Sequence, residues 1–118
     1  MKIKKKERKF KVGLNNIILK EVAKIYLEKN EMISFVKGKS EYDIVKKNWG
    51  YYATPSIDKR LRLNGFKTAL VINQYKNLYI MLVEKNKLKA FKKYCKDEKQ
   101  KKILWLDEIN NYKKLSNL

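Results

Sequence analysis

The stretch WGYYATPSIDKRLRLNG, residues 49–65, combines aromatic and basic side chains in a pattern that suits binding to a polyanion. Exposed aromatic rings can stack on nucleobases, and each such contact contributes about 1–3 kcal/mol in proteins that bind single strands. The candidate rings are those of Trp49, Tyr51, Tyr52 and Tyr79. Because side chains alternate along a strand, Tyr51 and Tyr52 cannot both face a core. The competing interpretation places one ring of the pair in the core and the other against a neighbouring helix.

The middle of the same stretch is typical of the start of a helix. As an N-cap, Thr54 would accept a hydrogen bond from a free amide, and Pro55 has no amide to lose in a first turn. The remaining amides and the helix dipole favour an anion such as phosphate, which Arg60 and Arg62 would also attract. Asp58 lies in the same turn and already complements the dipole, so the alternative is a helix start that binds only water.

Two further groups of basic residues are candidates for phosphate contacts. One lies in KIKKKERKFKV, residues 2–12, and consists of Lys4, Lys5, Lys6, Arg8 and Lys9. The other lies on the polar face of a helix predicted over 86–98 and consists of Lys89, Lys92, Lys93 and Lys96. A solvated polar face is the ordinary explanation for such lysines, but their nearly uniform sign favours a polyanion. Contacts of this kind supply affinity and salt dependence without reading sequence.

Catalysis has few candidate residues, because the chain contains no histidine. This removes the commonest general base, the Ser–His and Cys–His pairs and the usual zinc ligands. Glu41, Asp43 and Glu84 could hold magnesium for a carboxylate-dependent nuclease. However, Lys85 follows Glu84 directly, which departs from the Glu-x-Lys spacing of such enzymes, and helix capping accounts for Asp43. We therefore expect no catalytic residue, no metal and no cofactor.

The charge of the chain indicates the class of partner. Thirty Lys and Arg residues against twelve Asp and Glu give a net charge of +18 over 118 residues. Such a field attracts polyanions and speeds their encounter, so nucleic acid is the natural partner. The codon bias of an AT-rich genome also raises the lysine content of a protein, but it would raise the glutamate content as well. We therefore interpret the charge as functional.

The sequence also indicates a compartment. It has no apolar stretch near the roughly 18 residues that span a bilayer, and its basic start lacks the apolar core of a secretory signal. The single cysteine, Cys95, excludes an intramolecular disulfide and a zinc site built on several thiolates, and it is most simply a small core residue. We expect a cytoplasmic protein with no membrane partner.

Apolar spacing predicts the elements that would position these residues. Residues 1–12 form a basic arm and 13–118 a single domain. Leu14, Ile18, Val22 and Ile25 fall at helical spacing, which predicts a helix over 14–30. Ser40 and Asp43 form a capping box that would open a short helix ending near Lys47. The other predicted elements are strands at 32–36, 50–54, 66–73, 78–84 and 102–106, helices at about 55–64 and 86–98, and a final helix capped by Asp107.

From residue 50 to 106 the predicted order is strand, helix, strand, strand, helix, strand. This predicts an α+β fold with a ferredoxin-like, split βαβ antiparallel sheet, to which the N-terminal helix is added. The order resembles that of the RNA-recognition motif, in which aromatic residues on the first and third strands stack on bases. The resemblance is one of topology: the third strand, KNLYIMLVE, lacks that family's glycine-aromatic pattern and offers only Tyr79.

These observations favour a small, basic, non-catalytic protein that binds DNA or RNA. Lys and Arg would contact phosphates, and aromatic stacking would add to them. The alternative is a protein-interaction module, such as a phage- or plasmid-borne regulator, whose charge meets an acidic protein. A carboxylate- and magnesium-dependent nuclease is the third interpretation.

Overall fold

The chain forms two compact units, Met1–Thr54 and Pro55–Leu118, named here the first and the second unit. The computed structural model describes the backbone of residues 1–116 and the side chains in that range except those of 109, 112, 115 and 116. Most of its regular structure is β-strand, arranged in four small separate sheets.

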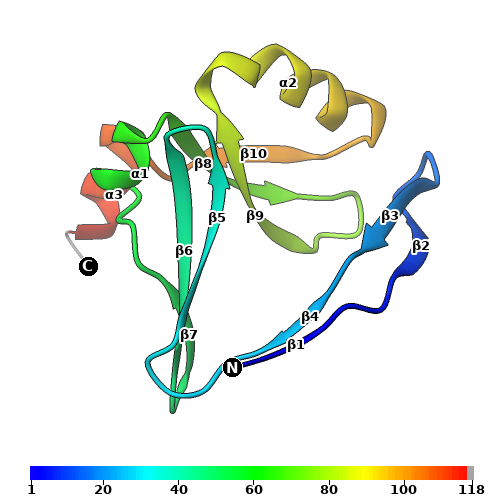
Figure 1. The fold of residues 1–118 in the computed structure, drawn as a ribbon. Coiled ribbons are helices and arrows are strands. Elements are labelled where there is room, and N and C mark those ends of the chain that lie inside the picture. The colour runs from blue at the N-terminus through cyan, green and yellow to red at the C-terminus, as the bar shows by residue number, and fades with distance from the viewer. Residues whose placement is uncertain (117–118) are drawn as a thin grey trace. The chain divides into compact units, whose positions relative to one another are not determined.

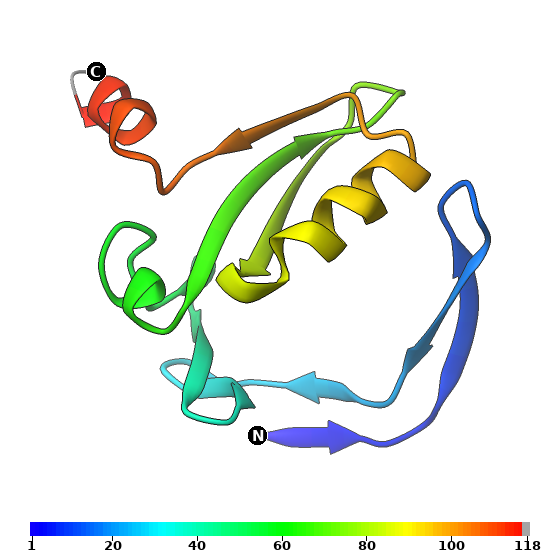
Figure 2. The same cartoon turned by 90° about the horizontal axis from the view of Figure 1, so that it is seen from above.

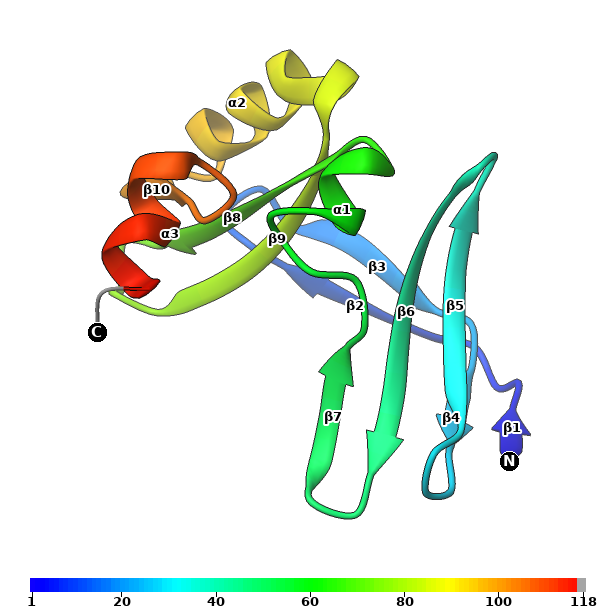
Figure 3. The same ribbon diagram turned by 90° about the vertical axis from the view of Figure 1, so that its left-hand side faces the viewer.

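The first unit consists of strands joined by turns. A two-stranded antiparallel ribbon comes first, in which β1 pairs with β4 and β2 pairs with β3 (Figure 1). An antiparallel meander of β5, β6 and β7 follows (Figure 3). Gly38, at φ +59°, makes the tight turn between β5 and β6, a conformation that glycine adopts without penalty. The strands are β1 (Lys2–Lys4), β2 (Arg8–Val12), β3 (Ile17–Glu21), β4 (Lys24–Tyr26), β5 (Met32–Lys37), β6 (Ser40–Lys47) and β7 (Gly50–Ala53).

A carboxylate lies at the centre of the meander. Asp43 is buried in the middle of β6, directly opposite Ser34 of β5. Its carboxylate accepts a hydrogen bond from the Ser34 hydroxyl and another from the Thr54 hydroxyl, the latter at 3.4 Å. Donors on both sides therefore compensate the cost of removing this charge from water.

The second unit is built on one three-stranded antiparallel sheet with the order β10-β8-β9. Helix α2 lies along one face of this sheet (Figure 2). Phe91 of α2 contacts Trp105 of β10 edge to face, with ring centroids 5.6 Å apart. Ala69, Val71 and Val83 are buried in this unit. The elements are α1 (Arg60–Leu63), β8 (Phe66–Ile72), β9 (Leu78–Glu84), a 3-10 helix η1 (Lys85–Lys87), α2 (Leu88–Asp97), β10 (Lys102–Trp105) and α3 (Ile109–Ser116).

A buried ion pair fixes the end of β10 to β8. The Asp107 carboxylate accepts hydrogen bonds from the Thr68 amide and from Nζ of Lys67, both at 3.0 Å. The same ammonium lies 4.8 Å from the centre of the Trp105 ring, a cation–π arrangement. Asp107 thus holds two neighbouring strands together, a role that its prediction as a helix cap did not include.

The predicted N-terminal helix over 14–30 is wrong. Residues Gly13–Asn16 form a turn, with positive φ at both Gly13 and Asn16, and β3 and β4 follow it. Besides its helical spacing, the stretch contains a strand spacing, because Ile17 and Leu19 alternate with Ile18 and Lys20 and lie on one face of β3. Pairing of β3 with β2 realises that second pattern.

The short helix predicted to start at Ser40 is also wrong, because residues 40–47 form β6. Ser40 and Asp43 therefore cap no helix there; Ser40 pairs with Lys37 across the β5–β6 turn. Two adjacent β-branched residues, Ile44 and Val45, are stiff at χ1 and suit a strand. The local capping pattern was overridden by pairing with β5 and β7.

The ferredoxin-like prediction is contradicted by the strand pairing. The element order from β7 to β10 matches the predicted one, but a split βαβ sheet would include all four strands in one sheet. Instead β7 pairs with β6 in the first unit, and β10 pairs with β8. The fold is mostly β, with several small sheets in place of one α+β sheet.

The predictions for the second half of the chain are largely confirmed. The β8–β9 hairpin pairs Phe66 with Glu84 and Ile72 with Leu78. Helix α2, strand β10 and helix α3 occur where the apolar spacing placed them, and Gly65, at φ +87°, follows α1 as the left-handed stop. Within residues 1–116, no helix combines the length and the apolar character that a membrane span requires.

Candidate nucleic-acid interface

An aromatic cluster lies at the tip of the β6–β7 hairpin. Trp49, Tyr51 and Tyr52 are 67%, 61% and 46% exposed. The Trp49 and Tyr52 rings are nearly parallel, with an interplanar angle of 15° and centroids 6.0 Å apart. Nζ of Lys46 lies 5.0 Å from the centre of the Tyr51 ring. The hairpin tip therefore presents a pre-stacked ring pair and a ring beside an ammonium, which together suit a base and its phosphate.

Tyr51 and Tyr52 are paired with two successive residues of β6, Lys46 and Val45. Their side chains therefore point to opposite faces of the hairpin, as predicted. Neither ring is buried, which contradicts the interpretation that one of them packs in a core. Tyr79, the fourth candidate ring, belongs to the second unit, where it lies on β9 opposite Val71 and is 46% exposed.

The phosphate site predicted at the start of a helix at Thr54 is not formed. Helix α1 begins at Arg60 and has only four residues, and its N-cap, Lys59, makes no side-chain capping bond. The hydroxyl of Thr54 is hydrogen-bonded to Asp43 instead. Arg60 is exposed and Arg62 is half-buried, so each remains a candidate for a phosphate contact as a surface cation, without help from a helix terminus.

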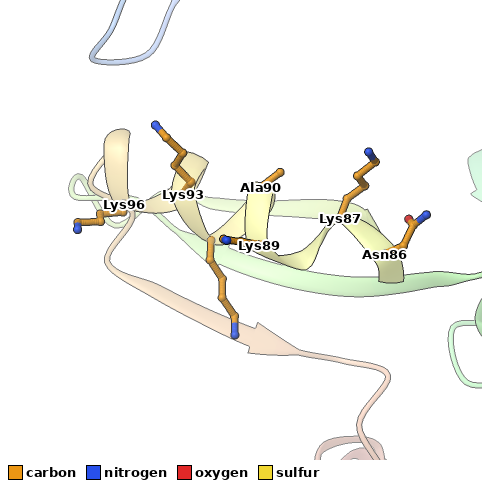
Figure 4. Close-up of a pocket in the computed structure, with 7 residues that line it drawn as sticks. Asn86, Lys87, Lys89, Ala90, Lys93 and Lys96 are labelled. Carbon is orange, nitrogen blue, oxygen red and sulfur yellow. The ribbon is translucent and has the colours of Figure 1, made fainter.

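The lysines predicted for α2 gather on its outer side. An open hollow of about 690 Å³ runs along this side and is lined by Asn86, Lys87, Lys89, Ala90, Lys92, Lys93 and Lys96. We name it the α2 hollow. Figure 4 shows Lys87 and Lys93 projecting outward on one side of the helix. Only Lys93 among these lysines forms an ion pair in the described chain, with Asp97 at 2.7 Å. Walls made of flexible lysine stems suit an extended anion better than a compact ligand.

The basic residues predicted for the N-terminal arm lie on the ribbon. Lys4 ends β1, and Lys5 and Lys6 lie in the short link before β2. Arg8 is held by Glu21, 3.3 Å away, and its guanidinium lies 5.1 Å from the centre of the Phe10 ring. Among the described residues Lys4, Lys5, Lys6 and Lys9 form no ion pair, so their charge is available to an outside anion.

Sequence reasoning missed four ribbon lysines, namely Lys2, Lys11, Lys20 and Lys24. The first two lie in segments where lysine alternates with an apolar residue, KIK and RKFKV, and that period-two pattern was the available signal. The other two fall within the helix predicted over 14–30, for which no partner strand was foreseen.

The carboxylates considered for a metal site are not assembled into one. Glu41 and Asp43 both lie on β6, whereas Glu84 ends β9 in the second unit. In the described part of the chain, no group of three or more acidic or cysteine side chains is arranged to hold a metal ion. Cys95 is buried on α2, and burial raises the pKa of its thiol, as expected for a core residue and not for a nucleophile.

Taken together, the fold and these surfaces define a small, mostly β, strongly basic protein with exposed rings. No family model, no curated protein and no solved structure matches this chain.

Proposed function

We propose that this chain is a non-catalytic nucleic-acid-binding protein of the cytoplasm. Lysine and arginine contact phosphates, and exposed rings at the β6–β7 tip add stacking. The observation that carries the proposal is the α2 hollow. Within residues 86–96 it is lined by five lysines and one asparagine, all of them exposed to solvent. An extended polyanion neutralises such a surface, and release of its counterions supplies affinity.

The charge distribution supports the proposal. The first unit carries 14 basic and 6 acidic residues, and the second carries 16 and 6, so both units are strongly positive. Because few carboxylates lie near the lysines of the α2 hollow, an outside anion has little competition there.

A second candidate function, binding to an acidic protein, is favoured by the ring cluster. Tryptophan and tyrosine are the residues most enriched in the centres of protein interfaces, and Trp49 and Tyr52 form a pre-organised pair. Lys46 and Lys47 next to them would meet acidic side chains of that partner. This candidate requires no nucleic acid at all, so one binding experiment separates the two.

The test is binding to fluorescent single- and double-stranded oligonucleotides across a salt series, with and without magnesium. We expect binding without magnesium and a steep loss of affinity with salt. The variant Lys89→Gln/Lys92→Gln/Lys96→Gln should lower the salt slope on a duplex by about 2–3, since each phosphate contact contributes about 0.9. The control variant Lys29→Gln/Lys39→Gln/Lys114→Gln removes the same charge from exposed positions elsewhere.

The outcomes decide between the candidates. Equal slopes for the two triple variants would mean that net charge alone drives binding and that the α2 hollow is no site. No binding to any oligonucleotide would leave the acidic-protein candidate. Cleavage that depends on magnesium would show catalysis and overturn the non-catalytic proposal.

A further inference from the structure

The two halves of the N-terminal ribbon are joined by an irregular step that changes the register. Lys4 lies opposite Lys24 in the first half, and Arg8 lies opposite Glu21 in the second. Three residues, 5–7, therefore face only two, 22 and 23, on the partner strand. None of these five residues is paired, so the two halves of the ribbon form separate two-stranded sheets.

Within the outer half of the ribbon, the register decides which side chains share a face, because directly paired residues of two antiparallel strands point to the same side. Lys9 is paired with Lys20, and Lys11 is paired with Ile18. We name the side that these residues share the lysine face; its lysines are Lys9, Lys11 and Lys20. The opposite side of this half is the apolar face, which carries Phe10, Val12, Ile17 and Leu19.

Two lysine pairs face each other directly across the ribbon, Lys4 with Lys24 and Lys9 with Lys20. Like charges in directly opposite positions destabilise an antiparallel pair. Two glutamates relieve part of this cost: Glu21 contacts Lys24, and Glu7 lies 3.6 Å from Lys20. An anion placed over the lysine face would relieve the remaining repulsion between Lys9 and Lys20.

We propose that the lysine face of this ribbon binds in the major groove of double-stranded DNA. The major groove of B-DNA, about 12 Å wide, admits a two-stranded β-ribbon. The lysine face carries lysines from both strands of the ribbon, and the phosphates of the two DNA strands flank the groove. Double-stranded RNA has a deep, narrow major groove that does not admit such an element.

The ribbon has dimensions that fit this role. Its outer half, residues 8–12 paired with 17–21, spans about 17 Å at roughly 3.4 Å per residue, close to half a turn of the duplex. Ile18 is the only apolar residue among the paired positions of the lysine face in that half. It is 63% exposed and can contact a thymine methyl group. Arg8 and Glu21 pair on the opposite face and cover part of Phe10.

This inference rests on the proposed function and assigns the major-groove contact to the first unit. The first test removes charge at exposed positions with Lys9→Gln/Lys11→Gln/Lys20→Gln. We expect affinity for a 16-base-pair DNA duplex to fall about tenfold and its salt slope by about 3, roughly one per lysine, with little change for single-stranded DNA. A uniform loss on single strands, DNA duplex and RNA duplex would overturn the groove assignment while leaving nucleic-acid binding intact.

The second test moves lysines without changing the composition. The variant Lys11→Val/Val12→Lys/Leu19→Lys/Lys20→Leu transfers two lysines to the apolar face at constant net charge. Its control, Lys11→Val/Lys20→Leu, loses the same two lysines from the lysine face. We expect both to bind the DNA duplex equally weakly; wild-type affinity in the transferred variant would overturn the proposal.

Two checks separate the possible causes of a lost signal. Circular dichroism compares the folding of each variant with the wild type, and the glutamine variant covers the case in which the transferred variant does not fold. If the wild type binds no oligonucleotide, the proposed function itself fails. If the wild type binds and the ribbon variants bind equally well, only the groove assignment fails.

Discussion

The buried ion pair between Lys67 and Asp107 gives the sharpest stability prediction. Asp107 is only 3% exposed and accepts hydrogen bonds from the Thr68 amide and the Lys67 ammonium. In Asp107→Asn, the amide oxygen keeps the bond to Thr68, but Lys67 loses its buried counter-charge. Breaking a buried pair by removing one partner costs about 3–5 kcal/mol. Because the Lys67 side chain is 18% exposed and Glu108 lies 3.9 Å from it, we expect the lower end, about 3 kcal/mol.

The assay is urea unfolding followed by tryptophan fluorescence. The two tryptophans lie in different units, Trp49 in the first and Trp105 in the second. In a Trp49→Phe background the signal comes from Trp105 alone, next to the ion pair. This choice makes the measurement report on the unit that carries the substitution.

Asp97→Asn is the matched control, because it removes the same charge from an exposed Lys–Asp pair on α2. Exposed helix pairs of this spacing contribute about 0.3–0.5 kcal/mol. A loss for Asp107→Asn no larger than that of Asp97→Asn would refute the reasoning. The double variant Lys67→Met/Asp107→Asn should be more stable than the sum of the two single changes predicts, since it leaves no unpaired buried charge.

Three further outcomes follow from the structure. Gly65→Ala should lower the free energy of unfolding, measured in urea, by about 1 kcal/mol, because an alanine is strained at a φ of +87°. No steric clash adds to this cost, since no atom lies within 4 Å of the added Cβ. Cys95 should react with a thiol reagent at pH 8 far more slowly than free cysteine until urea unfolds the chain, since burial raises its pKa. The Lys24 ammonium lowers the pKa of Glu21 below its ordinary 4.5. The ionised Glu21 therefore stabilises the fold fully above pH 4.5, and this stabilisation is lost as the pH falls through the lowered pKa. In Lys24→Gln, carboxyl NMR titration should move the pKa of Glu21 back toward 4.5.

The second half of the chain could be predicted from sequence because its signals are local. Two apolar runs separated by a short polar turn form the β8–β9 hairpin, and the left-handed Gly65 lies where the pattern of α1 ends. Helix α2 has a clear apolar stripe opposite its lysines. Each of these elements is indicated by a short run of neighbouring residues, which a single sequence displays.

The first half was predicted poorly because its strands depend on partners that the pattern does not name. Residues 17–25 satisfy a helical spacing and a strand spacing at once, and only the pairing of β3 with β2 selects the strand. The segment 50–54 was correctly predicted as a strand, but its partner is β6 and not β10. Local spacing gives the type of an element; the pairing that builds a sheet depends on residues elsewhere.

The same distinction governs the candidate sites. The rings of Trp49, Tyr51 and Tyr52 were found from composition, and their exposure follows from a hairpin tip that no other strand of the meander covers. The ribbon lysines were seen only in part, because a charged arm has no faces until it is paired. Lys9, Lys11 and Lys20 share a face because of the register of β2 and β3, which composition does not contain.

The pairing of β2 with β3 is therefore the feature that connects the sequence of the arm to a binding surface. Lys9 and Lys11 are two positions apart and share a face of β2. Lys20 lies directly opposite Lys9, so it joins the same face from the partner strand. A helix over 14–30 would have left Lys9 and Lys11 in an unpaired arm with no fixed relation to Lys20. Strand pairing instead creates a one-sided basic element, which is the form of charge that a groove with phosphates on both edges can bind.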